Sequence, residues 1–351
     1  MAQSKPKKKI RPWKVIVIGI LLLISSFIGG KIGYLQYELT SVIQHGEVSF
    51  QEMEVDAATL YDKDIINILL IGADSREEWN DSGRSDSSMI ATLDMKNGQL
   101  KLTSLMRDMY IDIPGHEKNR FNAAYKFGGV SLLNQTIAQN FNIRLDGYVV
   151  VDFKAFRDVI DELGGVTITL TELEANYLNN AYHGKIQVKE GKQVLSGKEA
   201  LAYTRIRQVP TSTGKHYDFG RTERQRTVLN SLFEKFKNQS FGELTNVLKM
   251  VLSNVTTDLS NKQISSLAFS VLKIEDKEIK QLCVPMEGTY TDIKVVLPAT
   301  TLPAKVLDVD IEANKEGIED FIFNKYEESS GQQDGTEKTT KTEESTQTEM
   351  P

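Results

Sequence analysis

The 351-residue sequence contains one cysteine, Cys283, and only four histidines. A single cysteine excludes an internal disulfide and a metal site built from several thiolates, and the histidines show no ligand-like spacing. Excess positive charge is also missing, because the net charge is −6 at pH 7. Nucleic-acid binding usually requires many cations to contact phosphates, so we expect no nucleic acid among the partners.

The only long apolar run lies near the N-terminus. Residues 15–35 contain one charged residue, Lys31, and are long enough to cross a hydrocarbon layer of about 30 Å. Residues 1–14 carry six lysines and arginines and no acid, so the positive-inside rule places them in the cytoplasm. We therefore expect a transmembrane helix, localisation at the cell membrane and an extracellular C-terminal domain. A cleaved signal peptide is the alternative, because Ser25-Ser26 and Gly29-Gly30 provide small residues for cleavage.

The remaining chain is acidic and divides into three parts. After residue 35 there are 35 lysines and arginines against 48 acids. Residues 36–64 have no strong period and are interpreted as a stalk, and residues 65–326 as one extracellular domain. Residues 327–351 are dominated by Ser, Thr, Glu, Gln and Lys, so we predict a disordered polar tail.

Strand and helix patterns alternate through the domain. Apolar runs and an Asn97-Gly98 turn signal predict strands, and amphipathic spacing predicts helices. The predicted strands cover residues 65–71, 87–94, 99–105, 148–152, 166–170 and 279–284, and the predicted helices cover 130–141, 153–163, 197–203, 222–237, 241–255 and 261–272. This order predicts an α/β fold with a mixed sheet sandwiched between helices.

Two segments combine arginines with carboxylates. The first contains Asp74, Arg84 and Asp86 and continues to Arg107-Asp108, and the second runs from Arg205 to Gln225. Each group in the first segment follows an apolar run predicted to be a strand. Such a mixture suits a pyrophosphate bridged to a divalent metal.

Local spacing adds detail to the second segment. In an extended segment Arg205 and Arg207 would point the same way, and an anionic ligand explains such a pair of like charges. Arg221 and Gln225 would share one face of a helix that begins near Gly220. Asp218 would precede this helix and could simply cap it. For the arginines the alternative is a set of surface ion pairs, such as Arg224 with Glu234.

The ordered motifs resemble the LytR-CpsA-Psr family of Gram-positive cell envelopes. The resemblance spans roughly residues 65–235 and rests on the motifs Asn67-Ile-Leu-Leu-Ile-Gly-Ala-Asp74-Ser-Arg76, Arg84-Ser-Asp86, Arg107-Asp108, Phe121-Asn-Ala-Ala-Tyr125, Gly197-Lys-Glu-Ala-Leu-Ala-Tyr203, Arg205-Ile-Arg207 and Asp218-Phe-Gly-Arg221-Thr-Glu-Arg224-Gln225. It implies a membrane-anchored enzyme that moves a phosphorylated glycopolymer, such as teichoic acid or capsule, from a polyprenyl-pyrophosphate carrier to peptidoglycan.

The resemblance also implies roles for individual residues. Asp74 and Asp86 would bind Mg²⁺, and Arg84, Arg107, Asp218 and Arg221 would be catalytic. The pyrophosphate would contact Arg84, Arg107, Arg205, Arg207, Arg221 and Gln225. The general base stays open among Asp74, Asp86, Asp108 and Asp218. The apolar helices between residues 222 and 272 would either wall a tunnel for the lipid or form plain core.

Three features depart from the family pattern. Met106 stands before Arg107 where proline is usual, Arg120 replaces a lysine, and residues 208–217 are expanded, which suggests a flexible lip over the site. Two other functions remain compatible with the sequence. A hydrolase could cleave the same pyrophosphate bond with water, and a non-catalytic envelope protein could bind anionic polymer or act as a regulator.

Overall fold

The computed structural model describes residues 43–51, 53, 59–73, 85–237, 241–274, 278–298 and 300–324, together with Gly33 and Tyr37. The predicted cytoplasmic segment, the predicted transmembrane helix apart from Gly33, and the predicted polar tail lie outside these residues. Asp74 and Arg84 lie outside them as well. Within the described part of the chain, no helix combines the length and apolar character needed to cross a membrane.

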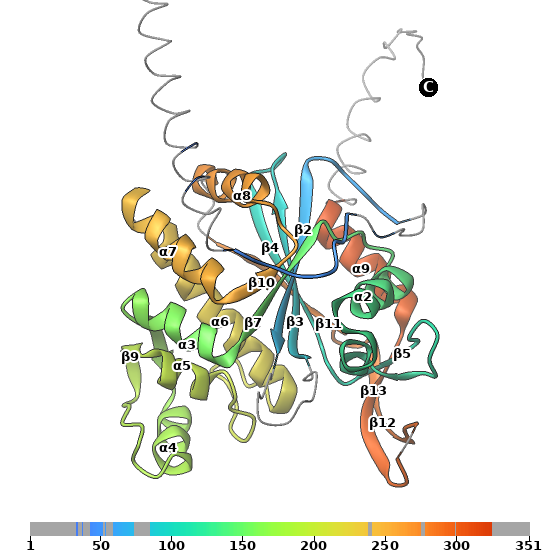
Figure 1. Cartoon of the computed structure of the whole chain (residues 1–351). Helices are drawn as coiled ribbons and strands as arrows, with labels where there is room; N and C mark the ends of the chain where they lie inside the picture. Colours follow the sequence, from blue (N-terminus) through green and yellow to red (C-terminus); the bar gives the residue numbers. More distant parts are fainter. Residues whose placement is uncertain are drawn as a thin grey trace, which may run out of the picture.

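A mixed seven-stranded sheet forms the centre of the domain (Figure 1). Its strands in spatial order are β1 (Gln44–His45), β10 (Val255–Thr257), β7 (Gly147–Asp152), β2 (Ile65–Ala73), β3 (Ser85–Asp94), β4 (Gln99–Leu105) and β11 (Lys280–Val284). β2 runs parallel to β7 and antiparallel to β3, and β11 runs parallel to β4. The predicted α/β class and mixed sheet are therefore confirmed.

Side-chain alternation in the central strands explains why the sheet is covered on both faces. Leu69 and Ile71 pack into the main core on one face, and Ile68 packs into a smaller cluster on the other. The predicted hairpin between β3 and β4 is also present, with Asp94 paired to Gln99 across a four-residue turn. Gly98 in this turn has φ of 61°, a conformation that glycine adopts without steric cost.

Helices cover the two faces of the sheet (Figure 1). On one face lie α2 (Phe121–Phe141) and α9 (Ile311–Phe323), and on the other lie α3 (Phe153–Glu162), α6 (Tyr217–Lys237), α7 (Phe241–Ser253) and α8 (Asn261–Lys273). α2 is kinked at Gly128 and Gly129, so the predicted helix from residue 130 is its second half. α3 starts at a cap in which Asp152 accepts a hydrogen bond from the Ala155 amide.

Two smaller sheets complete the domain. The first pairs β8 (Val166–Leu170) with β9 (Gly191–Leu195), next to α4 (Glu172–Ala181) and α5 (Gly197–Tyr203), and encloses a separate apolar cluster. The second has the order β12 (Tyr290–Val296), β13 (Pro303–Val309), β5 (Met109–Ile111) and β6 (Asn119–Arg120). The chain passes directly from the main sheet to this second sheet, because β5 is the next strand after β4.

Several features differ from the sequence predictions. Phe50 is buried in the main core and packs at a tilt against Tyr148 with ring centroids 4.9 Å apart, so part of the 36–64 segment belongs to the domain. α6 begins at Tyr217 rather than near Gly220, which places Asp218 in its first turn instead of before it. No sequence pattern predicted α4, α9, β9, β12 or β13.

Candidate functional site

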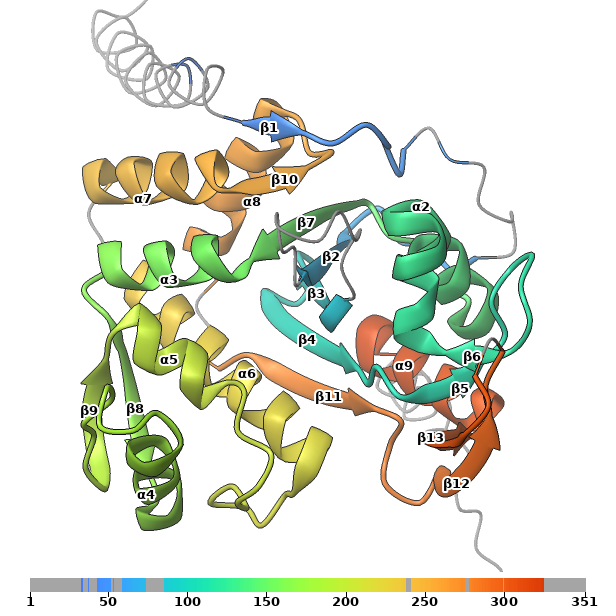
Figure 2. The ribbon, with the colours of Figure 1, turned by 60° about the horizontal axis from the view of Figure 1, so that its bottom comes forward.

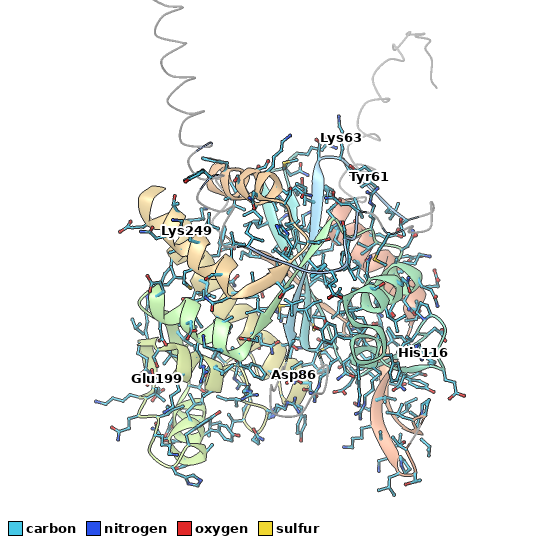
Figure 3. All side chains as sticks on the ribbon, in the orientation of Figure 1. Tyr61, Lys63, Asp86, His116, Glu199 and Lys249 are labelled. Carbon is cyan, nitrogen blue, oxygen red and sulfur yellow. The ribbon has the colours of Figure 1, made fainter. Side chains whose placement is uncertain are left out.

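The two charged segments meet at one end of the main sheet. Asp86 lies at the start of β3, Arg107 follows the end of the antiparallel neighbour β4, and α6 contributes its first turns. Figure 3 labels Asp86 at this end, with Tyr61 and Lys63 at the opposite end. The sheet topology therefore brings together groups that lie about 120 residues apart in the sequence.

Asp218 is surrounded by three guanidinium groups. Its Oδ1 atom lies 3.1 Å from Arg221 Nη2, 3.2 Å from Arg207 Nε and 3.7 Å from Arg107 Nη2. Arg221 is only 6% exposed, so this contact is largely shielded from water. The predicted residues Arg107, Arg207, Asp218 and Arg221 thus form one cluster, which we call the arginine cluster.

Two further carboxylates hold Arg107 in place. Arg107 Nη1 donates a hydrogen bond of 3.1 Å to Asp86 Oδ1, and its Nε lies 3.4 Å from Asp108 Oδ2. Asp108 also lies 3.3 Å from Arg120 Nε, and Arg120 Nη2 donates to the backbone oxygen of Lys305 on β13. Asp108 and Arg120 therefore join the site, although neither was among the predicted binding residues.

Burial and neighbouring charges shift the pKa values of Asp108 and Asp218 in opposite directions. Burial raises the pKa of Asp108, and a hydrogen bond with Asp218 adds to the increase. Burial would also raise the pKa of Asp218, but Arg221, the bond with Asp108, Arg107 and Arg207 together lower it below its usual value. Burial lowers the pKa of Arg221 to about 10, so this side chain is still charged at neutral pH.

The arginine cluster and its neighbours have unused hydrogen-bond donors. Among the described residues, Arg107 Nε, Arg120 Nε and Arg221 Nε are buried without a hydrogen-bond partner, although Asp108 lies at ion-pair distance from the first two. A buried donor without a partner costs about 1–3 kcal/mol, and more when it is charged. An anion with several oxygens would satisfy these donors.

A buried ion pair fixes the segment that carries Arg207. Arg224 is fully buried, and its Nε donates a hydrogen bond of 2.7 Å to Glu174 Oε1 on α4. The same guanidinium donates to the backbone oxygens of Ile206, Val209 and Pro210. The alternative pairing of Arg224 with Glu234 is wrong, since the partner of this guanidinium is Glu174. Glu174 was not foreseen because it lies 50 residues away in sequence.

The expanded segment 208–217 packs closely on the start of α6. The Thr211 amide donates to the Lys215 backbone oxygen, and Thr213 Oγ1 donates to Glu223 on α6. A Cβ atom at Gly220 would lie 2.7 Å from the Lys215 oxygen, so this close approach requires glycine. The predicted lip is a hydrogen-bonded turn.

Gln225 and Arg205 occupy the margins of the site. Gln225 Oε1 accepts a hydrogen bond from Ser87 Oγ, and Gln225 lines a small cavity together with Asp86, Arg107 and Arg221. Arg205 instead stacks over the Phe153 ring, with its guanidinium carbon 4.1 Å from the ring centroid. Residues 204–205 form a turn after α5, so the extended geometry predicted for Arg205 and Arg207 is not observed.

A metal ion would rely on Asp86 in this part of the structure. No group of three or more His, Cys, Asp or Glu side chains among the described residues is arranged to hold a metal. Mg²⁺ commonly takes only one or two carboxylates, with waters and phosphate oxygens as its other ligands. Asp86 is 32% exposed and offers carboxylate oxygens at the edge of the arginine cluster, so the residues present fit a phosphate-bound Mg²⁺.

Comparison with known proteins gives one matching family and several similar relatives. The LytR_cpsA_psr family profile matches residues 33–307. The regulatory protein MsrR of Staphylococcus aureus strain COL is 33% identical over 73% of this chain and 74% of its own length. The polyisoprenyl-teichoic acid–peptidoglycan teichoic acid transferase TagU of Bacillus mycoides is 34% identical over 73% of this chain and 81% of its own length.

A solved structure extends the comparison to the fold. The family protein YwtF (TagT) with bound octaprenyl pyrophosphate lipid superposes with a TM-score of 0.59 at 25% identity, covering 79% of this chain and all of that chain. The profile match covers most of the chain, including every residue of the arginine cluster. The chain therefore belongs to the LytR-CpsA-Psr family.

Proposed function

We propose that the protein is a membrane-anchored extracellular transferase that moves a phosphorylated glycopolymer, of the teichoic acid or capsule type, from a polyprenyl-pyrophosphate carrier to peptidoglycan. The bond formed is a phosphodiester to an acceptor hydroxyl. The observation that carries this proposal is the arginine cluster, whose buried guanidinium N–H groups lack hydrogen-bond partners among the residues that the structure describes. The name of the TagU relative and the lipid bound to TagT support the same substrate class.

Charge balance favours a pyrophosphate ligand. Arg107, Arg120, Arg207 and Arg221 supply four positive charges, against three carboxylates at Asp86, Asp108 and Asp218. These seven side chains together therefore keep an excess of positive charge even when all three acids are ionised. Guanidinium groups bind two phosphate oxygens at once, which matches the shape of a pyrophosphate.

These residues can stabilise the transition state mainly by position and charge. Phosphoryl transfer spreads negative charge over several oxygens while the attacking and leaving oxygens are roughly in line. Arg207 and Arg221 approach one point from two different elements, so their N–H groups can contact oxygens on different sides of the reacting phosphorus. When bound, Mg²⁺ would be held by Asp74 and Asp86 and would neutralise part of the pyrophosphate charge.

The carrier lipid requires an apolar surface beside the arginine cluster. On the face covered by α6, α7 and α8, many apolar side chains are only partly buried, among them Leu70, Val149, Val151, Leu248 and Phe269. Each methylene removed from water contributes about 0.8 kcal/mol, so a polyprenyl chain would gain much by lying against them. We assign the lipid to this layer.

The direct test uses the full chain in detergent with a synthetic polyprenyl-pyrophosphate disaccharide and a peptidoglycan oligosaccharide. We expect mass spectrometry to show a phosphodiester-linked product and release of polyprenyl monophosphate. Product on the acceptor supports a transferase, whereas phosphorylated disaccharide formed from water in the presence of acceptor would indicate a hydrolase. An unchanged donor would refute both.

Metal removal gives a second test of this function. We expect EDTA to abolish transfer and Mg²⁺ to restore it, because the carboxylates at the cluster provide a site for a phosphate-bound cation. Asp86→Asn should raise the Mg²⁺ concentration for half-maximal activity by about tenfold or more and reduce the thermal stabilisation that donor and Mg²⁺ produce together. Asp112→Asn, at an exposed aspartate, serves as the control. Full activity in EDTA would contradict the metal requirement.

A further inference from the structure

A second cavity adjoins the arginine cluster. It is a cleft of about 810 Å³ between the start of α6 and the β12–β13 hairpin. In Figure 2 the strand β11 lies between these two elements. Asp108 and Asp218 line the cleft and also contact the arginines, so the cleft and the arginine cluster meet at these two carboxyls.

Aromatic rings from both sides of the cleft line it, with Phe219 on α6 and Tyr290 on β12. Phe219 stacks on Tyr290 with ring centroids 5.2 Å apart, and both residues line the cleft. Tyr217, at the lip, is 73% exposed and has φ of 49°, a conformation that non-glycine residues rarely adopt. Exposed aromatic rings provide flat apolar surfaces with a polar hydroxyl, which suits the faces of sugar rings.

Two lysines on the β12–β13 hairpin and Arg226 on α6 also line the cleft. Lys294 and Lys305 are directly opposite each other in the β12–β13 ladder, and both are exposed in the cleft. Like charges at such a pair destabilise a sheet unless an anion lies near them. On α6, the Nε and Nη1 atoms of Arg226 are buried without hydrogen-bond partners in the described part of the chain. Four described carboxylates also line the cleft, but Glu287 pairs with Lys215, and Asp108 and Asp218 contact arginines. Asp292 is then left against Lys294, Lys305 and Arg226, so the cleft favours a ligand that carries negative charge.

We propose that this cleft binds the acceptor, a glycan with carboxylate groups such as one containing muramic acid, and that Asp108 removes the proton from the attacking hydroxyl. This inference rests on the proposed transferase function. The acceptor oxygen forms a bond to the phosphorus that carries the glycopolymer, and the bond from this phosphorus to the bridging oxygen breaks. Polyprenyl phosphate leaves with the electron pair, and the hydroxyl proton passes to the Asp108 carboxylate.

Asp108 suits the role of base better than its neighbour. Asp218 faces three guanidinium groups, which stabilise its negative charge and make it a weak proton acceptor. Asp108 contacts two guanidinium groups, those of Arg107 and Arg120, shares a hydrogen bond with Asp218 and lies at the cleft surface. Burial raises the pKa of Asp108, which moves it in the direction required of a base that works near neutral pH.

The proton-transfer step predicts a specific pH profile. Asp108 must be ionised to act, so kcat should fall as the pH drops through a pKa above 3.8, the ordinary value of this group. Asp108→Asn should lower kcat by about 10²–10⁴-fold and remove this acid limb, while the KM for the donor changes little. Asp112→Asn, at an exposed aspartate outside the cleft, should keep the wild-type profile. An unchanged acid limb in Asp108→Asn would overturn the role of this residue.

The binding role of the cleft can be tested by reversing one charge. Lys294→Glu creates an opposite-charge pair with Lys305, so the folded state should be at least as stable as the wild type. Because the cleft then loses cations, the KM for a muramic-acid-containing tetrasaccharide should rise about tenfold or more. The KM for the donor and for a chitotetraose acceptor, which has no carboxylate, should stay near wild type.

Matched controls separate the failure of this inference from the failure of the transferase function. Lys63→Glu reverses an exposed lysine at the opposite end of the molecule (Figure 3) and should change neither KM. If the wild type transfers polymer but Lys294→Glu keeps its acceptor KM, or changes the donor KM instead, the cleft is not the acceptor site. If the wild type transfers nothing, calorimetry with the tetrasaccharide still tests the cleft. Equal binding by the wild type and Lys294→Glu, or no binding by either, would then reject it.

Discussion

Replacing Arg221 with lysine is expected to lower kcat/KM for the lipid pyrophosphate donor by about 10²–10³-fold. Arg221 is 6% exposed, lies 3.1 Å from Asp218 and keeps a buried Nε with no hydrogen-bond partner in the described part of the chain. Lysine preserves the charge but not the two parallel donors that contact two phosphate oxygens. Because the charge is unchanged, the loss should come from the missing second hydrogen bond to the phosphate. Steady-state kinetics with a synthetic donor would measure it.

The matched control for this substitution is Arg144→Lys. Arg144 is exposed and lies 4.6 Å from the centroid of the Tyr61 ring, at the opposite end of the molecule from Asp86 (Figure 3). This variant should retain wild-type kcat/KM. Circular dichroism should show native folding in both proteins. If Arg221→Lys retained kcat/KM within about threefold, the arginine cluster would not be the site at which charge develops.

The sequence predicts the central sheet well because its strands are apolar runs bounded by turn residues. β2, β3, β4, β7 and β8 agree with their predicted positions within a few residues. β12 and β13 were missed for a physical reason. Every residue of β12 is at least partly exposed, so this strand has no buried apolar run, and its pairing with β13 depends on contacts formed only in the fold.

In the candidate site, too, some residues could be predicted from the sequence and others could not. The charged motifs, together with the family resemblance, predicted Asp86, Arg107, Arg207, Asp218 and Arg221, which the fold brings together. The direction of a side chain after a turn could not be predicted, as the stacking of Arg205 on Phe153 shows. Asp108 was only one of several possible bases. Its shared contacts with Arg120 and Asp218 required the tertiary structure.

Glu174→Ala is expected to lower the free energy of unfolding by about 3–5 kcal/mol, the largest stability effect predicted for this chain. The substitution leaves the fully buried Arg224 guanidinium without its carboxylate, and urea unfolding would measure the loss. Replacing both partners with methionine should recover much of that stability, since no buried charge is then left unpaired. The double variant should still transfer polymer poorly, because the bonds from Arg224 to the backbone oxygens of Ile206, Val209 and Pro210 are gone and Arg207 is no longer fixed. A stable double variant with full activity would show that this ion pair supports the fold without positioning the site.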